Sequence, residues 1–466
     1  MERAMIETLS KRVGEEVKIM GWVTGRRDHG KLIFFDLRDA SGTVQVVVAP
    51  GPAHPLADKL RPEWVVEVIG QINARPGKMF NSEIQNGEIE MAVKEIKILN
   101  EAETPPFNLA SDGREIGEET RLKYRYLDLR RSRLQKNLGL RHRMIKLIRG
   151  YLDERNFLEI ETPILTKSTP EGARDYLVPS RLYSGQFYAL PQSPQQYKQL
   201  LMVAGIEKYF QIARCFRDED TRGDRQPEFT QLDLEMAFID QEAVMILNEA
   251  LLIELVKTLT PKKKIQQTPF PRLTYAEAMS KYNTDRPDLR ESKENPDLLA
   301  FCWVTDFPFF SAEGGPASGG ETRWTFTHNP FSAPKPEHLD HLLKKEGIGE
   351  ILTSQYDIVL NGFEIGGGSI RSHQPATLRA VFEILGYSTE QIENNFGHLL
   401  RALAAGAPPH GGIAWGLDRL LAIFADEPNI REVIAFPKTG EGKDLMMNAP
   451  APVDPEQLKE LKIKIG

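Results

Sequence analysis

Alternating apolar and polar residues run through most of the first hundred positions of this chain. Residues 17–23 and 44–48 alternate in this way, and apolar residues recur across 64–69 and 89–93, with turn residues such as Asn86-Gly87 between the segments. A two-residue period is the pattern of strands that bury one face. About five short strands in this length favour a small closed barrel, and an OB-fold is the form we expect.

The segment "EAETPPFNLASDGREIGEET" (101–120) then interrupts the pattern with prolines and many polar residues. Such composition indicates a hinge, so we expect a barrel domain over 1–104, a hinge over 105–132 and a second domain over 133–466. Apolar residues after the hinge recur at helical spacing and predict a long amphipathic helix; they are Leu134, Leu138, Ile145, Ile148 and Leu152.

The second domain contains strand-like segments that no regular helices separate, among them "FLEIETPIL", "QFYALP", "YFQIARCF" and "FTQLDLEMAF". This arrangement favours an antiparallel sheet over a doubly wound parallel one, and therefore an α+β fold class. The Gly-rich stretch 313–320 is expected to form a flexible surface loop.

Composition narrows the class of protein. The 466 residues exceed one typical core, and the net charge of −7 argues against attraction of nucleic acid to the whole surface, while a local basic face stays open. Two distant cysteines, Cys215 and Cys302, exclude a disulfide framework and a Cys-based zinc site. Because we find neither a signal peptide nor an apolar run of membrane-spanning length, we expect a cytoplasmic protein without a membrane span.

The barrel region carries cations beside aromatic residues. "GRRDHGKLIFFDLRD" (25–39) places Arg26, Arg27, His29 and Lys31 near Phe34 and Phe35, and Gln45 follows on the next strand. Cations that hold phosphates and aromatic faces that stack on bases are the needs of a single-stranded nucleic-acid site. A barrel with a solvated charged loop would look similar, so this pattern alone leaves both interpretations open.

The stretch "FRDEDTRGDRQPEFTQLDLE" (216–235) is dense in arginines and carboxylates. Arg217 and its neighbours offer planar forks for phosphate oxygens, Glu219 and Gln226 can bind an amino-bearing base, and Phe229 can stack on that base. Asp233 is placed to pair with an ammonium group. A loop of mutually neutralising salt bridges explains the composition equally well.

Two preceding segments suggest a gated pocket. "STPEGARDYLVPS" (168–180) reads as a mobile turn with Glu171 able to reach an ammonium group. In "LPQSPQQYKQLLMVAG" (190–205), Gln195 and Lys198 open a helix whose backbone NH groups would hold a carboxylate. The same segment also reads as an ordinary helix with Ser193 as its N-cap and Pro194 at its first position.

Two Gly-rich segments complete the candidate site. "SQYDIVLNGFEIGGGSIRSH" (354–373) carries Asp357 and Glu364, which suit a hydrated Mg²⁺, then three glycines that allow close approach of a ligand, then Arg371. "PPHGGIAWGLDRLLAIF" (408–424) runs from a strand into a helix with Arg419 in its first turn. Neither segment matches a P-loop or a dinucleotide fingerprint.

Taken together, these motifs resemble those of the class II aminoacyl-tRNA synthetases, and in detail the bacterial aspartyl-tRNA synthetases. "YLDERNFLEIETPIL" resembles motif 1, the 216–235 stretch motif 2, and "GIAWGLDRLLAIF" motif 3. "STPEGARDY", "QSPQQYKQLL" and "NGFEIGGGSIR" resemble the aspartate-specific signatures, and "IREVIAFPKT" the bacterial C-terminal segment. The resemblance covers nearly the whole chain and implies a homodimer that uses ATP, Mg²⁺, L-aspartate and tRNA-Asp.

The resemblance also implies roles for individual residues. Arg217 and Arg419 would be catalytic, with Arg217 on the ATP α-phosphate and the attacking carboxylate and Arg419 at the γ-phosphate end, and Asp357 and Glu364 would carry Mg²⁺. ATP would be bound by Arg217, Asp218, Glu219, Gln226, Phe229, Glu364, Gly416, Leu417, Asp418 and Arg419. Aspartate would be bound by Glu171, Ser193, Gln195, Lys198, Arg217, Asp233, His328 and Arg371. The anticodon would be bound by Arg27, His29, Phe34 and Gln45.

Three departures sharpen the expectation. The large bacterial insertion is reduced to a linker at 291–302, and His328-Asn329-Pro330-Phe331 stands where bacterial members often have two histidines. His29 occupies a position in the barrel where it resembles the anticodon loop of members that also charge tRNA-Asn.

Two alternatives predict different sequences. A silent tRNA-binding paralogue would be expected to lose Arg217 and Arg419, and an amide-forming paralogue would be expected to lack the barrel. This sequence has both arginines and the predicted barrel.

Overall fold

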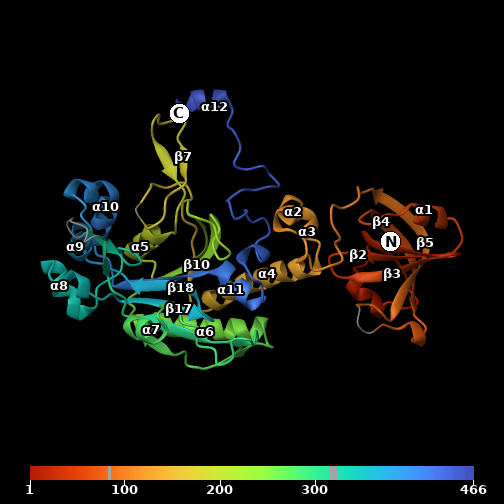
Figure 1. Ribbon diagram of the computed structural model, residues 1–466, viewed down its shortest axis with the longest axis horizontal. Helices are drawn as coiled ribbons and strands as arrows, with labels where there is room; N and C mark the ends of the chain where they lie inside the picture. Colours follow the sequence, from red (N-terminus) through yellow and green to blue (C-terminus); the bar gives the residue numbers. More distant parts are fainter. Residues whose placement is uncertain (82–84, 170, 314–322, 466) are drawn as a thin grey trace. The chain divides into compact units, whose positions relative to one another are not determined.

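The computed structural model describes residues 1–81, 85–169, 171–313 and 323–465 (Figure 1). The chain divides into two compact units, one of residues 1–121 with 126–131 and the other of residues 122–125 with 132–466. Most of the expected surface loop at 313–320 lies outside the described residues, as does Pro170 of the predicted mobile turn.

The first unit contains a closed five-stranded barrel, which confirms the predicted OB-type fold. Its strands are β1 (Glu16–His29), β2 (Leu32–Arg38), β3 (Thr43–Val48), β4 (Val65–Ala74) and β5 (Ile89–Asn100). They close in the order β1-β2-β3-β5-β4, with η1 (Ile6–Lys11) and α1 (His54–Lys59) as short helices. All neighbouring strands are antiparallel except β3 and β5.

Strict alternation builds the barrel core and leaves a polar outer face. On β2, Ile33, Phe35 and Leu37 are fully buried, while Phe34 and Asp36 between them point outward and are half-buried. Successive side chains of a strand face opposite sides, so one apolar row fills the interior. The segment expected as a hinge holds two short helices, α2 (Glu118–Lys123) and α3 (Arg125–Asp128).

The second unit is built on an eight-stranded sheet in the order β12-β14-β17-β18-β19-β10-β9-β6. The strands are β6 (Leu158–Glu159), β9 (Lys208–Phe216), β10 (Glu228–Ala237), β12 (Arg272–Thr274), β14 (Phe301–Thr305), β17 (Gln355–Leu360), β18 (Phe363–Ile370) and β19 (His410–Gly416). The central strands are antiparallel, as predicted, but the outermost pairs β12–β14 and β6–β9 are parallel. The sheet is therefore mixed at both edges, and the α+β class holds.

Helices cover this sheet and supply most of its core. The predicted amphipathic helix is α4 (Ser132–Asp153), which buries Leu134, Met144, Ile148 and Leu152. It packs with α6 (Gln241–Leu259) and α11 (Leu417–Phe424) against apolar side chains of β10, β17 and β19, including Leu232 and Trp415. In Figure 1, α6 and α7 (Tyr275–Tyr282) lie along one side of the sheet.

A second group of helices packs at the end of the sheet where the candidate site opens. These are α5 (Gln195–Val203), α9 (Pro375–Ile384) and α10 (Thr389–Ala404), with α8 (Leu339–Lys344) beside α9. Three two-stranded ribbons complete the unit: β7 (Leu177–Pro179) with β8 (Phe187–Ala189), β11 (Lys264–Ile265) with β13 (Leu298–Leu299), and β15 (Phe310–Glu313) with β16 (Arg323–Phe326). The last helix is α12 (Pro455–Leu461). Within the described ranges, no helix combines the length and apolarity needed to cross a bilayer.

Candidate active site

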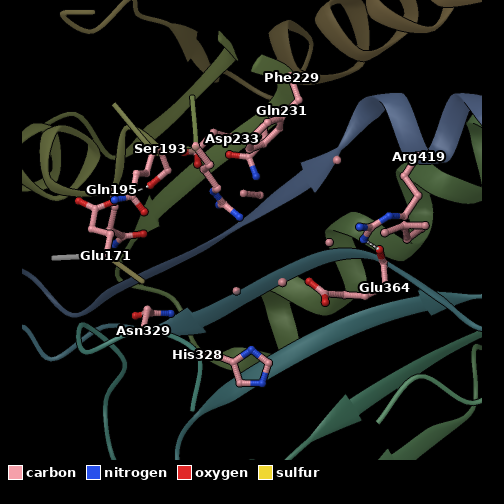
Figure 2. A pocket seen from close by; sticks show the side chains of 18 of the residues that line it. Glu171, Ser193, Gln195, Phe229, Gln231, Asp233, His328, Asn329, Glu364 and Arg419 are labelled. Atoms are coloured by element: carbon pink, nitrogen blue, oxygen red, sulfur yellow. Dashed lines mark hydrogen bonds between the residues drawn. The ribbon is translucent and has the colours of Figure 1, made fainter. Parts of the chain in front are cut away.

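A cavity of about 350 Å³ lies above strands β10, β18 and β19, between the starts of α5 and α11 (Figure 2). Figure 2 shows Glu171, Ser193 and Gln195 together on one side and Glu364 with Arg419 on the other. The structure brings most of the predicted site into this one space. The predicted residues that line it are Glu171, Ser193, Gln195, Lys198, Arg217, Glu219, Gln226, Phe229, Asp233, His328, Asp357, Glu364, Arg371, Gly416, Asp418 and Arg419.

Two predicted ATP-binding residues do not line the cavity. Asp218 is exposed. It lies between Arg217 and Glu219 in the chain, and the side chains of those two neighbours both face the cavity. Leu417 is fully buried in the apolar core beneath the site. The order of motif residues predicted both positions, but the direction of each side chain decides which of them reach the cavity.

A buried cluster of charges forms one end of the cavity, where the sequence predicted aspartate binding. Lys198 Nζ lies 3.0 Å from each carboxylate oxygen of Asp233 and 3.2 Å from Glu235. The Arg371 guanidinium donates to both oxygens of Glu235, at 2.9 and 3.1 Å. Sequence reasoning missed Glu235. The available signal was its position two residues after Asp233, which places both side chains on the same face of a strand.

The two carboxyl groups of this cluster differ in their tendency to ionise. Burial alone would raise the pKa of Glu235, but the adjacent Arg371 and Lys198 cations outweigh it and hold that pKa at about 2. Burial raises the pKa of Asp233 to about 6, against the opposing effect of Lys198. Lys198 donates its hydrogen bond to Asp233 Oδ2, so Oδ1, although 3.0 Å from the Lys198 nitrogen, accepts no hydrogen bond from the described residues. Asp233 is thus the carboxylate that gains most from a further cation, such as an ammonium group.

The predicted mobile turn is held against the cavity by hydrogen bonds. Glu171 accepts from the Thr169 hydroxyl at 2.9 Å and from the Ser193 hydroxyl at 3.1 Å, and burial raises its pKa. Gln192, which the sequence did not single out, donates to Ala173 O and accepts from Ala173 N. Ser193 does not cap α5 as predicted. The helix begins at Gln195 after Pro194 without a side-chain cap, because the Ser193 hydroxyl bonds Glu171 instead.

Two guanidinium groups present unpartnered donors to the cavity. The Arg217 guanidinium lies over the Phe229 ring, 5.1 Å from its centroid, and its buried Nε has no hydrogen-bond partner among the described residues. Arg419 donates to the Glu364 carbonyl oxygen and, at 3.3 Å, to Asp224, and its buried Nε likewise lacks a partner within the described ranges. Buried donors without partners are costly, so both groups favour an anionic ligand.

Three other predicted ATP-binding side chains already have protein partners. Gln226 accepts from the Lys438 NH at 2.7 Å and donates to the Lys438 carbonyl at 3.1 Å. Glu219 lies 3.6 Å from Arg225 in an ion pair at the tip of the β9–β10 hairpin. Asp418 accepts from Thr230 N at 3.0 Å and pairs with Arg141 of α4. Asp418 therefore also joins the helix to the sheet beneath the cavity.

Asp357 and Glu364 converge over the backbone of Gly367. A Cβ atom at Gly367 would lie 2.8 Å from Asp357 Oδ1 and 3.5 Å from Glu364 Oε1, and one at Gly368 would lie 2.1 Å from Gly412 O. Burial raises the pKa of Asp357, and the charge of Glu364 raises it further. Two carboxylates at close quarters offer the hard oxygen ligands that Mg²⁺ prefers. No third His, Cys, Asp or Glu in the described part of the chain joins them, so waters and phosphate oxygens would complete the coordination.

His328 and Asn329 line the cavity from the loop after β16. The His328 ring contacts Phe307 edge-on with centroids 4.6 Å apart, and burial lowers the His328 pKa while Glu364 opposes that effect. Asn329 Oδ1 accepts from Phe331 N at 3.0 Å and so closes the local turn. At the position where a second histidine was expected in relatives, the amide therefore shapes the loop.

In the barrel unit, the predicted anticodon residues share one outer face. Phe34 and His29 contact edge-on with centroids 5.5 Å apart. Arg27 donates to Asp36 at 3.2 Å and to Gln45 at 3.4 Å, and Gln45 donates to Glu90 at 3.3 Å. Arg27 and His29 are exposed, so this face of β1, β2 and β3 offers a cation, an aromatic ring and amide groups to solvent.

Comparison with known families gives two matches that follow the two structural units. Residues 117–440 match the family described as tRNA synthetases class II (D, K and N). Residues 17–99 match the family described as OB-fold nucleic acid binding domain. Together the two matches cover most of the chain.

Individual relatives match over their full length. The chain is 43% identical to the aspartate--tRNA(Asp/Asn) ligase of Rubrobacter xylanophilus, over 98% of this chain and 96% of that protein. It is 39% identical to the aspartate--tRNA ligase of Staphylococcus carnosus, over 97% of this chain and 95% of that protein. The Rubrobacter alignment spans 585 positions against a chain of 466, so that relative has more than a hundred positions with no counterpart here.

Solved structures share the fold at lower identity. An asparaginyl-tRNA synthetase from Pyrococcus horikoshii, complexed with asparaginyl-adenylate, superposes with a TM-score of 0.74 at 22% identity, over 94% of this chain and 98% of that one. An aspartyl tRNA synthetase from Entamoeba histolytica gives a TM-score of 0.72 at 22% identity, over 94% of this chain and 91% of that one. The near-complete coverage shows that the compact two-unit layout is shared.

Proposed function

We propose that this chain, which belongs to the class II tRNA synthetases (D, K and N), joins L-aspartate to tRNA through an aspartyl-adenylate. The observation that carries the proposal is the distribution of charged groups in the cavity described above. One end has Lys198, Asp233 and Arg371, which suit a small zwitterion with a second carboxylate, the other has Arg419 beside Glu364, and both Arg217 and Arg419 carry unpartnered donors. An amino acid and a nucleoside triphosphate would meet between these ends.

In the first step, a carboxylate oxygen of aspartate forms a bond to the α-phosphorus of ATP, and the bond from that phosphorus to pyrophosphate breaks. Arg217 would hold both reacting groups, Phe229 would stack on adenine, and Arg419 would hold the γ-phosphate. Asp357 and Glu364 would hold Mg²⁺, which neutralises phosphate charge when bound. Positioning and charge neutralisation supply the rate enhancement, and no protein nucleophile is needed.

In the second step, a hydroxyl of the terminal tRNA ribose attacks the carbonyl carbon of the mixed anhydride, and AMP leaves. Selection of aspartate over asparagine falls to Lys198 and Arg371, because an amide in place of the carboxylate would leave these buried cations poorly paired. Glu171, Ser193, Gln195 and Asp233 would surround the α-ammonium group, and His328 would lie beside them.

Partner choice rests on the barrel. We propose that Arg27, His29, Phe34 and Gln45 bind the anticodon, with Phe34 as the stacking ring and Arg27 on a phosphate. His29 and the Asp/Asn name of the Rubrobacter relative support charging of tRNA-Asn as well as tRNA-Asp. Charging assays with both transcripts test this extension, and absence of aspartylation of tRNA-Asn would restrict the enzyme to tRNA-Asp.

We also propose a cytoplasmic homodimer. Motif 1 and the β7–β8 ribbon expose large apolar side chains, namely Leu158, Ile164, Leu165, Leu177 and Phe187. Exposed apolar groups of this kind mark association surfaces. Sedimentation of the full chain would give the mass of two copies, and a monomer at micromolar concentration would contradict the proposal.

The linker at 291–302 is the proposed site of the segment that the Rubrobacter relative has in addition.

The test of the central proposal is exchange of labelled pyrophosphate into ATP. Exchange should depend on aspartate and should be far weaker with asparagine. Exchange without subsequent charging of tRNA would favour an amide-forming enzyme instead, and no aspartate-dependent exchange would overturn the proposal.

A further inference from the structure

A chain of three hydrogen-bonded side chains runs from the cavity wall into the core. Gln195 lines the cavity at the start of α5, and Gln199 one turn later and His410 at the start of β19 are fully buried behind it. Gln195 Nε2 donates to Gln199 Oε1 at 3.1 Å, and Gln199 Nε2 lies 3.3 Å from His410 Nε2. His410 Nδ1 lies 2.7 Å from Pro408 O.

The far end of this chain fixes the direction of every bond in it. A carbonyl oxygen can only accept, so His410 Nδ1 must carry a hydrogen and donate to Pro408 O. In the neutral imidazole, Nε2 is then the acceptor, and the group that faces it must be the NH₂ of Gln199. The carbonyl oxygen of Gln199 therefore points to Gln195 and accepts from its NH₂.

The NH₂ group of Gln195 is therefore bound to Gln199, and the carbonyl oxygen of Gln195 is the group that can contact a ligand. Figure 2 shows Gln195 beside Glu171 and Ser193, on the same side of the cavity as Asp233. An amide oxygen there adds an acceptor to the carboxylates of Glu171 and Asp233, and an ammonium group needs acceptors. An amide turned the other way would present hydrogens to the ammonium group.

We propose that Gln199 and His410 are positioning residues that hold the Gln195 amide with its oxygen toward the α-ammonium group of the amino acid. This inference rests on the proposed function, because it assumes an amino-acid substrate at this end of the cavity. Neither residue touches the cavity. Their effect on binding passes entirely through the orientation of one amide.

The arrangement requires a neutral His410. Charged groups near His410 are Glu235 and Arg371, with His373 of the segment before α9; burial lowers the His410 pKa, Glu235 opposes that effect, and the other two reinforce it. A protonated His410 would donate from both nitrogens. Gln199 would then have to present its oxygen to His410, and Gln195 would turn its NH₂ toward the cavity.

The test compares aspartate with succinate, which keeps both carboxylates and lacks the ammonium group. In the Gln199→Leu variant, the KM for aspartate in pyrophosphate exchange should rise roughly tenfold, the lower end of the range for one hydrogen bond to a charged group. The inhibition constant of succinate, the KM for ATP and kcat should stay nearly unchanged. His410→Asn, which keeps a donor near Pro408 O but lacks an acceptor for Gln199, should behave in the same way.

Matched variants separate orientation from general damage. His410→Gln can place an amide oxygen near the original Nε2 position and should restore most of the aspartate affinity. His341→Asn on the exposed surface of α8 should change nothing. Equal loss of aspartate and succinate binding in Gln199→Leu, or no loss of either, would overturn the inference.

A measurement on the unaltered protein covers the case in which variants fail to fold. With ¹⁵N-labelled histidine, the spectrum of His410 should show a protonated Nδ1 and an unprotonated Nε2 at neutral pH, and the opposite tautomer would overturn the inference. Absence of aspartate-dependent exchange in the unaltered protein would instead refute the proposed function. The two failures are therefore distinct.

Discussion

The candidate polar side chains are exposed or half-buried in the barrel but almost completely buried in the cavity of the second unit. In the barrel, the core is apolar, and the candidate residues Arg27, Phe34 and Gln45 sit on the outer face with exposed or half-buried partners. In the second unit, Lys198, Glu235 and Arg371 are almost completely buried beside the apolar core. A surface site can change one residue at a time, whereas buried charges depend on one another.

The largest effect should come from Arg217. Arg217→Ala removes a buried donor that we propose holds the reacting phosphate, and aspartate-dependent exchange should fall by about 10³-fold, the scale of losing one preorganised charge donor. The melting temperature should change little. Arg214→Ala is the matched control, because Arg214 is exposed and pairs with Glu228 across the same hairpin. Retained exchange in Arg217→Ala would remove Arg217 from the mechanism.

The next effect separates buried from exposed ion pairs. Glu235→Gln leaves Arg371 and Lys198 partly unpaired inside the protein, and we expect a loss of about 3 kcal/mol in the free energy of unfolding measured in urea. Lys94→Ala in the barrel removes an exposed ion pair with Glu16 and should cost about 0–1 kcal/mol. Similar losses for the two variants would contradict the contrast drawn between the regions.

A pH profile tests the charge state of Asp233. Burial raises the pKa of this carboxyl to about 6, so in the free enzyme it is ionised above pH 6 and protonated below. Since an ammonium group binds the ionised form, the KM for aspartate should rise about tenfold for each pH unit below 6 and level off above. Asp233→Asn should bind aspartate weakly and lose this dependence. A profile that stays flat down to pH 5 would assign the ammonium contact elsewhere.

The smallest effect should come from the barrel. Phe34→Ala removes one stacking ring, and tRNA affinity should fall by about tenfold, within the range for one base. Pyrophosphate exchange, which needs no tRNA contact in the barrel, should be unchanged. Leu56→Ala, which removes an exposed apolar side chain from α1 of the same unit, serves as the control. A loss of exchange in Phe34→Ala would mean that the two units do not act independently.

The sequence predicted the parts of the molecule that periodicity and motif order determine. Alternation gave the barrel, helical spacing gave α4, and the order of motifs gathered most site residues in one cavity. What it missed depends on side-chain direction and on partners distant in sequence. Ser193 bonds Glu171 instead of capping α5, Leu417 faces the core, and Glu235 pairs with Arg371, 136 positions away. No pattern among neighbouring residues of the sequence predicts such contacts between distant residues.

The floor of the cavity limits how this enzyme can change over evolution. At Gly367 a side chain would meet the Asp357 carboxylate, and at Gly368 it would meet the backbone of β19. A side chain at Gly368 is excluded whatever its chemistry, because the backbone that it would meet has no alternative rotamer, and one at Gly367 would displace the Asp357 carboxylate. New amino-acid preferences must therefore arise in the walls, from α5, the loop around Glu171 and the loop of His328 and Asn329. The strands beneath the cavity would stay the same in enzymes that select different amino acids.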